Sequence, residues 1–359
     1  MSKVKVLHVI ARMNLGGTAN YINKLVENNP NSYLATGHVQ KFEIEVPNIE
    51  NLGVYRVKDL GRKISPINDF KSWIELRKII KKLKPQIIHT HTFKAGLIGR
   101  LIPGKYKRVH TFHGQLFDDP SFSCFTKKLI FLIEKLLAYR TDFFISVGQK
   151  VGNELRSKGI GRQKTWASVP PGVCQLTRYE KLEARYKLNL PKNGLIVGWL
   201  ARVTQVKNPK LISEIARNFP EFTFAIGGNG DEYDSIKASA PSNLILLGWV
   251  DPAYFWSAVD IAISTSHNEG MPISIIEAQL YGIPAISFDV GSTSEVIENG
   301  ATGYIVKGDL IEFQAKLERI LNSEDLRQKF GKNAKEVSER KFNVPLLIKT
   351  HDNIYKNLI

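Results

Sequence analysis

Two glutamates, Glu269 and Glu277, are separated by seven residues in the segment HNEGMPISIIEAQLYGIPAIS, residues 267–287. A strand-like run precedes this segment, and Pro272 suits the first position of a helix that stops at Gly282. Free amides at the start of such a helix carry partial positive charge, which predicts a diphosphate site. Glu269 would then accept hydrogen bonds from sugar hydroxyls, and Glu277 from a ribose. A helix cap and a salt-bridge partner are the alternative interpretation of the pair.

Two cations, Arg202 and Lys207, occur in the segment LARVTQVKN, directly after another buried strand-like run. A guanidinium binds phosphate oxygens through two parallel hydrogen bonds, and an ammonium adds a compact charge. At the end of a strand these side chains are expected to hold a phosphate group. Ordinary surface cations are the alternative.

A pair of glycines, Gly16 and Gly17, follows the first strand-like run, VKVLHVI. Glycines let the backbone approach a ligand closely, and Thr18 could cap the following helix, whose amides would face a phosphate. By itself this pattern is more often a simple turn.

Strand-like and helical segments alternate along nearly the whole chain. The strand-like runs occupy residues 4–10, 86–90, 108–113, 142–147, 195–201, 222–227, 244–248, 260–264, 284–288 and 303–306. Helical periodicity is clear in residues 69–84 and 210–219. This alternation predicts the α/β class, with buried parallel sheets flanked by helices and ligands beyond the carboxyl ends of the strands.

The segment VPPGVCQ, residues 169–175, breaks the alternation and suggests a linker. We therefore expect two doubly wound, Rossmann-like domains facing across a cleft, comprising residues 1–172 and 173–340. A C-terminal helical segment, residues 341–359, could cover the second domain or cross back to the first.

The positive charge is concentrated in the first half of the chain. Of the 359 residues, 50 are Lys or Arg and 34 are Asp or Glu, giving a net charge of +16. Residues 1–172 contain 29 Lys and Arg against 12 Asp and Glu, whereas the remainder is nearly neutral. A basic half favours an anionic partner such as nucleic acid, a membrane surface or a phosphorylated substrate, although a solvated basic face is equally compatible. No recognition-helix motif or interleaved aromatic pattern is present, so we expect no nucleic-acid partner.

Other features favour a cytoplasmic location. Cys124 and Cys174 are too few for a disulfide framework. No apolar run approaches the roughly 20 residues of a membrane span, and the first apolar run is too short for a signal peptide.

Taken together, the motifs resemble those of retaining glycosyltransferases of family four, which have the GT-B fold. The segment EGMPISIIE matches their E-x7-E motif, and the Gly-Gly turn and the R-x4-K spacing of Arg202 and Lys207 match as well. Further matching segments are HTHTFKAGLIGRL (89–101), VHTFHG (109–114), GGNGDE (227–232), LLGWV (246–250) and VGSTSEVIENGATGYIV (290–306). The resemblance covers almost the whole chain.

The resemblance implies roles for the matching positions. The residues expected to act in catalysis are His113, Arg202, Lys207 and Glu269. The residues expected to bind the nucleotide-sugar donor are Gly16, Gly17, Gly228, Asn229, Gly230, Trp249, Val250, Gly270, Met271, Pro272, Ile273, Ser274 and Glu277. His113 would approach the transferred sugar, packing against a strand being the alternative. No cofactor and no metal are expected, in agreement with the absence of an Asp-x-Asp triplet.

The resemblance also implies an activity: transfer of a sugar from a nucleotide-diphosphate sugar, expected to be a UDP-sugar, with retention of the anomeric configuration. The acceptor would be a lipid-linked saccharide on the side of the basic N-terminal domain, in the synthesis of a cell-surface polysaccharide such as capsule or O-antigen. The basic helix at residues 69–84 could then lie on an anionic lipid surface at the cytoplasmic face of the inner membrane, or be an ordinary outer helix.

Two departures from the family pattern leave the donor sugar open. The segment PPGVCQ stands where many relatives have Asn-Gly-Val-Asp, and Met271 stands where many have phenylalanine or leucine. A non-hydrolysing sugar-nucleotide epimerase, which shares the architecture, is the alternative function.

Overall fold

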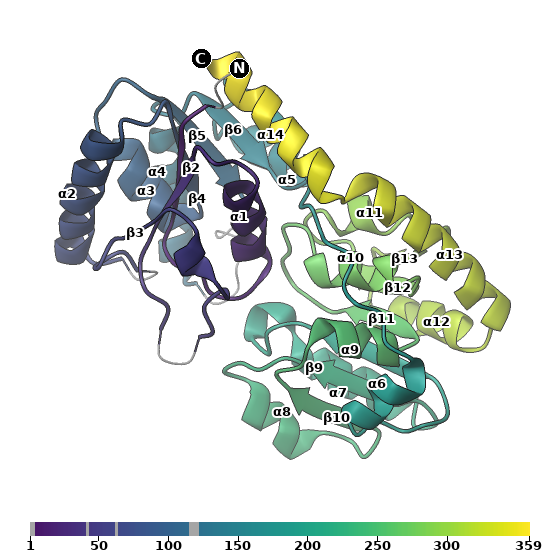
Figure 1. The fold of residues 1–359 in the computed structure, drawn as a ribbon. Coiled ribbons are helices and arrows are strands. Elements are labelled where there is room, and N and C mark those ends of the chain that lie inside the picture. The colour runs from purple at the N-terminus through teal and green to yellow at the C-terminus, as the bar shows by residue number, and fades with distance from the viewer. Residues whose placement is uncertain (1–3, 41–42, 62–63, 115–121) are drawn as a thin grey trace. The chain divides into compact units, whose positions relative to one another are not determined.

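The computed structural model describes residues 4–40, 43–61, 64–114 and 122–359, which divide into two compact units (Figure 1). Unit 1 contains the described residues up to Gly172 together with Val344–Ile359, and unit 2 contains Val173–Asn343. The last helix therefore belongs to the unit in which the chain begins. Among the described residues, every helix is too short or too polar to cross a lipid bilayer.

The described part of unit 1 is built on a seven-stranded parallel sheet with the order β3-β2-β1-β4-β5-β6-β7. Its strands are β1 (Val6–Ile10), β2 (Ser32–Thr36), β3 (Val54–Arg56), β4 (Ile87–His91), β5 (Lys107–Phe112), β6 (Phe143–Ser146) and β7 (Thr165–Ser168). The chain leaves β1 for β2 and leaves β4 for β5 in opposite directions. This reversal creates a switch point between the neighbouring strands β1 and β4, where doubly wound sheets bind ligands.

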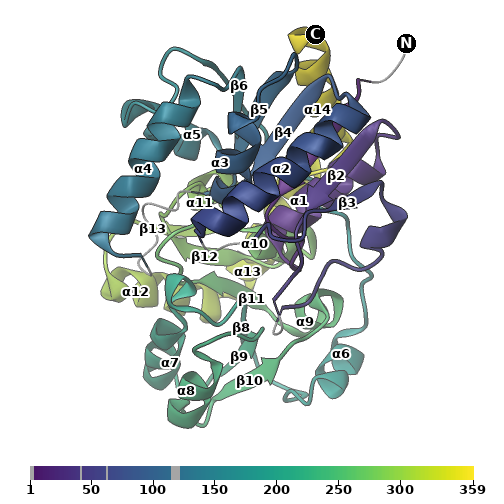
Figure 2. The same ribbon diagram turned by 90° about the vertical axis from the view of Figure 1, so that its left-hand side faces the viewer.

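Helices cover both faces of this sheet. They are α1 (Gly17–Glu27), η1 (Ile49–Asn51), α2 (Pro66–Leu83), α3 (Phe93–Leu101), α4 (Cys124–Ala138), α5 (Gln149–Ser157) and α14 (Val344–Leu358). Side chains of a strand alternate between faces. Leu7 and Val9 accordingly pack with the apolar residues of α2 and α3, whereas the His8 ring lies near Tyr355 of α14. Figure 2 shows α2, α3 and α4 along the same face of the sheet.

The described part of unit 2 has a six-stranded parallel sheet with the order β10-β9-β8-β11-β12-β13. Its strands are β8 (Ile196–Leu200), β9 (Thr223–Gly227), β10 (Leu244–Gly248), β11 (Ile261–Ser264), β12 (Ala285–Phe288) and β13 (Gly303–Val306). The switch point here lies between β8 and β11. The inner strands of both sheets are nearly all buried, as expected for parallel sheets covered on both faces, whereas the edge strands β3, β7 and β10 are mostly half-buried.

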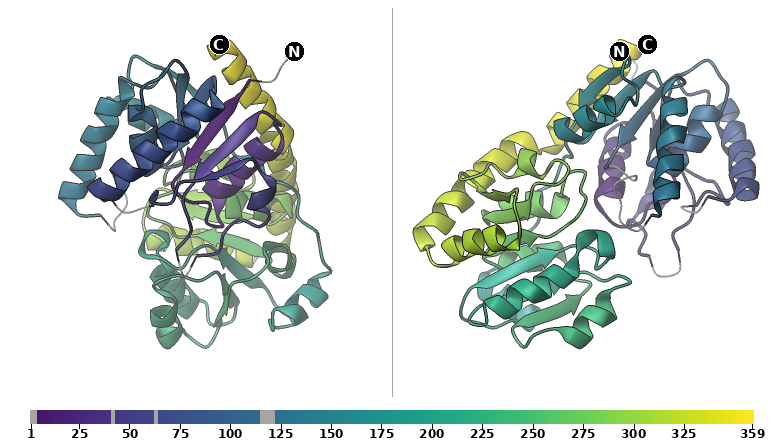
Figure 3. Two further views of the ribbon diagram at one scale, coloured as in Figure 1. Left: turned by 60° about the vertical axis from the view of Figure 1, so that its left-hand side comes forward. Right: turned by 180° about the vertical axis from the view of Figure 1, so that it is seen from behind.

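The two faces of this second sheet are covered by different helices, seen from two sides in Figure 3. The helices are α6 (Lys181–Lys187), η3 (Gln205–Lys207), α7 (Pro209–Asn218), α8 (Tyr233–Ser239), α9 (Pro252–Ala258), α10 (Ile273–Leu280), α11 (Thr293–Val296), α12 (Leu310–Leu321) and α13 (Glu324–Lys341). Trp199 of β8 belongs to a core shared with α7, α8 and α12. Its neighbour Gly198 faces α9, where a Cβ atom would lie 3.0 Å from Phe255 and Val259. The missing side chain allows α9 to pack closely on the opposite face.

Candidate active site

The loops that follow β8 and β11 carry the charged residues singled out in the sequence. In the loop after β8, Lys207 closes the short helix η3, and its Nζ donates a hydrogen bond to Oε1 of Glu269 at 2.5 Å. Ser266 Oγ donates to the same carboxylate oxygen at 2.7 Å. The structure therefore brings Lys207 and Glu269 together and fixes the glutamate between a cation and a hydroxyl. Ser266 was not predicted, although it lies only three residues before Glu269 in the same loop.

Arg202 lies in the loop after β8 but is exposed, and it forms no ion pair among the described residues. Its guanidinium is thus available for an anion. This end of the sheet therefore carries one cation that is neutralised by a carboxylate, Lys207, and one that forms no ion pair among the described residues, Arg202.

The helix that carries the second glutamate begins within this site. Pro272 is the N-cap of α10 and lies one residue before the helix, not at its first position as predicted, and no side chain caps the helix. The first-turn amides of Ile273 and Ser274 therefore lack intrahelical partners. The preceding residues Gly270 and Met271 are buried, so this end of the helix is fixed by packing.

A glycine on the next loop fixes the backbone of Glu269. Gly291 has a φ of +52°, and a Cβ atom there would lie 1.8 Å from the carbonyl oxygen of Glu269. The amide of Ser292 donates to the carbonyl of Gly270 at 3.0 Å. The loops after β11 and β12 are thereby joined, which gives the VGSTS part of the sequence a structural role that had not been recognised.

Glu277 is half-buried on α10, and Trp256 Nε1 of α9 donates to its Oε2 at 3.3 Å. Burial raises the pKa of this carboxyl to about 7, and the hydrogen bond from Trp256 offsets only part of that effect. This carboxyl is therefore partly protonated near neutral pH, and hydrogen bonds donated by hydroxyl groups such as those of a ribose would stabilise its ionised form. Trp256 was missed because its contact spans 21 residues of sequence.

The glycines of the loop after β9 permit close backbone contact. Cβ atoms on Gly228 and Gly230 would lie 1.9 and 2.2 Å from the carbonyl oxygens of Ala201 and Val203. Val203 in turn donates its amide to the carbonyl of Asn229 at 3.0 Å. These glycines thus have a structural reason to be present, and they bring their loop against the one that carries Arg202.

The loop after β10 adjoins this arrangement. The Gly228 amide donates to the carbonyl of Gly248 at 2.6 Å, and the adjoining Trp249 is 47% exposed. Val250 follows it in the same loop and is half-buried. An exposed indole at the rim of a polar site can stack on a planar ligand.

In unit 1, α1 starts at Gly17, and Gly16 is its N-cap. No side chain caps this helix, and Thr18 lies inside its first turn. The prediction that Thr18 caps the helix is therefore wrong, because the helix begins one residue earlier. Without such a cap, the first-turn amides are available to an external acceptor.

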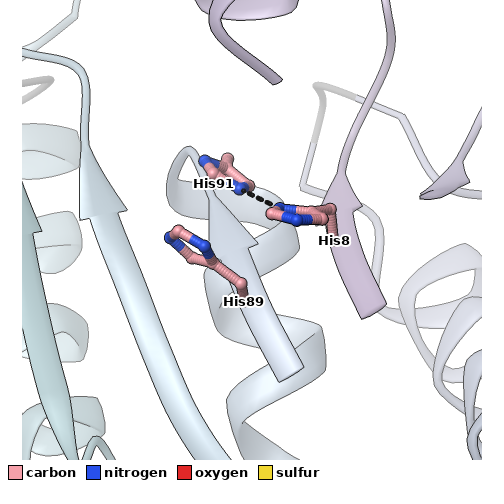
Figure 4. Close-up of side chains that lie close together, drawn as sticks. All are labelled: His8, His89 and His91. Carbon is pink, nitrogen blue, oxygen red and sulfur yellow. Dashed lines mark hydrogen bonds between the residues drawn. The ribbon is translucent and has the colours of Figure 1, made fainter. Parts of the chain in front are cut away.

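Histidines from β1, from β4 and from the residues that follow β5 gather inside unit 1. Figure 4 shows His8, His89 and His91, which have nitrogen atoms within 4.8 Å of one another. His8 Nδ1 lies 3.1 Å from His91 Nε2, and His91 Nδ1 lies 3.1 Å from Nε2 of the predicted site residue His113. The two nitrogens of His89 lie 2.6 Å from Tyr355 Oη and Thr111 Oγ1. Because His89 and His91 use both nitrogens in hydrogen bonds, the cluster is arranged as a bonded network and not as an open set of metal ligands.

The C-terminal helix completes this network. Tyr21 Oη lies 3.2 Å from His351 Nε2, and His351 Nδ1 lies 3.0 Å from the carbonyl oxygen of Leu347. Burial, together with a smaller contribution from electrostatic interaction with His351, lowers the pKa of His8 and of His113 to about 3, and burial lowers the pKa of His351 to about 4. These imidazoles are therefore neutral at physiological pH. The role of α14 in this site was not foreseen.

The outer helices of unit 1 expose apolar side chains beside cations. On α2, the predicted surface helix, Ile67, Phe70 and Ile74 are 71, 63 and 38% exposed, at a helical spacing that places them on one side. The exposed lysines of the same helix and its end are Lys71, Lys78, Lys81, Lys82 and Lys84.

Helix α4 presents a second apolar stripe, which sequence reasoning missed. Leu132 and Leu136 are 55 and 60% exposed, and Phe125 and Leu129 continue the stripe toward the start of the helix. Glu134, by contrast, points inward and pairs with the buried Arg100 of α3 at 2.7 Å. The helix therefore buries one charged side chain, Glu134, and exposes a stripe of apolar side chains beside the exposed Lys128 and Lys135.

Comparison with known proteins gives two family matches. Residues 18–173 match the family described as Glycosyltransferase Family 4, and residues 180–337 match Glycosyl transferases group 1. A capsular polysaccharide biosynthesis glycosyltransferase, CapM of Staphylococcus aureus, is 25% identical over 85% of this chain and 86% of its own. A UDP-Gal:alpha-D-GlcNAc-diphosphoundecaprenol alpha-1,3-galactosyltransferase of Escherichia coli is 26% identical over 100% of this chain and 98% of its own.

Solved structures show the same fold. HepE of Anabaena in complex with UDP and glucose superposes with a TM-score of 0.85 at 16% identity, covering 99% of this chain and 100% of that one. Sucrose-phosphate synthase from Thermosynechococcus elongatus gives 0.84 at 18% identity, covering 99% of both chains. The predicted fold class, two Rossmann-like parallel-sheet domains of the GT-B type, is confirmed.

Proposed function

The chain belongs to the family-four, group 1 glycosyltransferases, and on this basis we propose that it transfers a sugar from a UDP-sugar to a lipid-linked saccharide with retention of configuration. The observation that carries the proposal is the arrangement at the end of the second sheet. There Glu269, the uncapped start of α10 and the half-buried Glu277 follow one another along a single loop and helix, and Lys207 pairs with Glu269 from the loop after β8.

The donor is assigned to unit 2 by the chemistry of these groups. Glu277 accepts hydrogen bonds from the ribose, and Glu269 from hydroxyls of the transferred sugar. Arg202, Lys207 and the amides of Ile273 and Ser274 face the diphosphate. Gly228–Gly230 and Trp249–Val250 surround the base, whose planar ring the exposed indole of Trp249 suits. From unit 1, Gly16, Gly17 and His113 contribute to donor and sugar binding.

The proposed reaction breaks the bond between the anomeric carbon and the diphosphate oxygen, and the diphosphate leaves with the electron pair. The acceptor hydroxyl forms its bond to the anomeric carbon on the same face, and its proton passes to the departing phosphate oxygen. Preorganised cations and amide donors stabilise the charge that develops on the leaving group. Neither glutamate acts as a nucleophile. We propose that these groups act without a divalent metal ion, so that a chelator leaves the rate unchanged.

Acceptor and pathway are proposed from the relatives. The E. coli relative is named for a diphosphoundecaprenol acceptor and the S. aureus relative for capsular polysaccharide biosynthesis. An anionic, lipid-linked acceptor suits the basic first half of this chain. We propose a function in capsule or O-antigen synthesis, with unit 1 resting peripherally on the cytoplasmic face of the inner membrane through the apolar and cationic residues of α2 and α4.

A thermal-shift series with UDP, GDP and their sugar conjugates tests donor binding, because a ligand that binds the folded protein raises its melting temperature. We expect UDP-sugars to stabilise the protein and Glu277→Ala to reduce that shift. Stabilisation by none of these nucleotides would contradict the proposal.

A second assay distinguishes sugar transfer from the alternative function, epimerisation of the sugar nucleotide. The protein is incubated with UDP-sugars in the presence and absence of a polyprenyl-diphosphate saccharide. Transfer that requires the acceptor supports the proposed function, whereas epimerisation of the donor without an acceptor would replace it.

A further inference from the structure

Three imidazoles form a continuous hydrogen-bonded chain inside unit 1. It runs from His8 on β1 through His91 on β4 to His113 after β5, with both N···N distances at 3.1 Å. Figure 4 shows the first link. The ring of Tyr21 meets that of His113 edge to face, with centroids 5.0 Å apart and an interplanar angle of 88°, which restricts the rotation of His113.

The tautomers of the three rings are coupled. A neutral imidazole has one N–H and one bare nitrogen, and each N···N hydrogen bond requires one of each. Burial keeps His8, His91 and His113 neutral by lowering the pKa of each ring. Assigning the proton on His8 therefore assigns the protons on His91 and His113 as well.

The inner end of the chain selects one of the two possible directions. His8 is fully buried, and its Nε2 has no hydrogen-bond partner among the described residues. A buried N–H without an acceptor is more costly and rarer than a bare acceptor. The proton of His8 thus resides on Nδ1 and is donated to His91 Nε2. His91 then donates from Nδ1 to His113 Nε2, which leaves the proton of His113 on Nδ1.

We propose that His8 is a positioning residue that acts through His91 to hold His113 as its Nδ1–H tautomer, so that His113 donates a hydrogen bond to an oxygen of the transferred sugar. The inference rests on the proposed contact between His113 and that sugar. It adds a residue on β1 that no motif indicated, and it assigns His113 as a hydrogen-bond donor and not as a base.

The tautomer is measured directly in the full-length protein labelled with ¹⁵N-histidine, using long-range ¹H–¹⁵N correlation spectra without substrate. The His113 signals are identified by their loss in His113→Gln. We expect Nδ1–H in the wild type and in His8→Asn, whose amide can donate to His91 from nearly the same position. We expect a mixture of tautomers in His8→Leu. His38→Leu, which removes an exposed imidazole, is the matched control.

Kinetics supply the second measurement. His8→Leu should lower kcat about tenfold or more with the KM for the donor nearly unchanged, and His8→Asn should restore most of kcat. An Nε2–H tautomer of His113 in the wild type, or an unchanged tautomer and kcat in His8→Leu, would overturn the inference. Failure of the proposed function would look different, because no sugar transfer would occur while the spectra still showed the Nδ1–H tautomer.

Discussion

Lys207 Nζ lies 2.5 Å from Glu269 Oε1, so a cation proposed to face the diphosphate is bonded to the carboxylate proposed to hold the sugar. Both side chains are largely buried, 18 and 11% exposed, whereas Arg202 in the same loop is exposed. Both cations are proposed to bind the diphosphate, but only Lys207 also forms an ion pair that can stabilise the protein without substrate.

Substitution separates the two cations. Arg202→Ala should lower kcat about 100-fold and leave the melting temperature unchanged, because one charge-stabilising donor is lost from an exposed position. Lys207→Ala should lower kcat similarly and also reduce the free energy of unfolding by about 1–2 kcal/mol, since Glu269 loses its cation. Steady-state kinetics and chemical denaturation measure the two effects. The double variant should have no detectable turnover but a native circular-dichroism spectrum.

A suitable control for both variants is Lys210→Ala, because the Lys210 side chain is 69% exposed and lies 3.5 Å from Glu232. It should match the wild type in both measurements. Full activity in the Arg202→Ala, Lys207→Ala double variant would contradict the proposal that these residues bind the diphosphate.

The pKa of Glu277, raised to about 7, makes folding stability depend on pH. Below pH 4.5 the carboxyl is protonated in both the folded and the unfolded chain. Between pH 4.5 and 7 the unfolded chain releases its proton first, so this residue lowers the stability of the folded state as pH rises. The free energy of unfolding of Glu277→Gln should therefore exceed that of the wild type by about 3 kcal/mol at pH 8, and by progressively less as pH falls to 5. Urea denaturation across this range measures the difference, and the exposed Glu318→Gln should show none.

The same carboxyl should make nucleotide affinity depend on pH. Ribose hydroxyls donate to the ionised form, so binding of UDP by the wild type should weaken up to about tenfold from pH 8 to pH 6, as the carboxyl takes up its proton. Calorimetric titration of the wild type and of Glu277→Gln at each pH isolates this contribution, because the ionisation of UDP itself affects both proteins equally. Parallel pH profiles would show that Glu277 does not meet the nucleotide.

Membrane association should depend on the outward leucines of α4. Leu132→Ser with Leu136→Ser removes apolar surface that is 55 and 60% exposed, so it should abolish sedimentation with anionic liposomes and leave the melting temperature unchanged. Ile311→Ser in unit 2, at a side chain that is 75% exposed, is the matched control and should sediment like the wild type. If the wild type sedimented equally with neutral and anionic vesicles, the proposal that it binds an anionic membrane would be contradicted.

Removing one partner of the buried pair Arg100 and Glu134 should lower the free energy of unfolding far more than replacing both partners with apolar residues. Glu134→Ala leaves a buried guanidinium without its carboxylate and should lower the free energy of unfolding by about 3–5 kcal/mol. Arg100→Met combined with Glu134→Leu replaces the pair with apolar groups and should recover most of that loss. Urea denaturation compares the two, and a double variant no more stable than Glu134→Ala would contradict this explanation.

Sequence periodicity predicted the strongly apolar strands, and it missed the inner strand β2 and the edge strands β3 and β7 of the first sheet. β2 has the sequence SYLAT, which begins and ends with a polar residue. β3 has three residues, all half-buried, and the β7 sequence TWAS lacks an apolar run. Such strands are specified by pairing with a neighbour, as β3 pairs with β2, and not by their own composition.

The site was predictable where residues follow a strand and begin a helix, as Glu269, Pro272 and Glu277 do, because these positions follow from local pattern. The partners of these residues were not predictable. Trp256 reaches Glu277 from another helix, and His8 reaches His91 from another strand. Contacts of this kind exist only after the sheet order has been established. The orientation of α4 was missed for a related reason, since only the buried Arg100 explains why Glu134 points inward.

Because of helix α14, the two units are completed at different times during synthesis of the chain. His351 and Tyr355 supply partners for Tyr21 and His89, so the interior of the first unit is completed by residues translated after the whole of the second. On the ribosome, these hydrogen bonds of the first unit cannot form until α14 has been translated, whereas Val173–Asn343 of the second unit have all been translated before it.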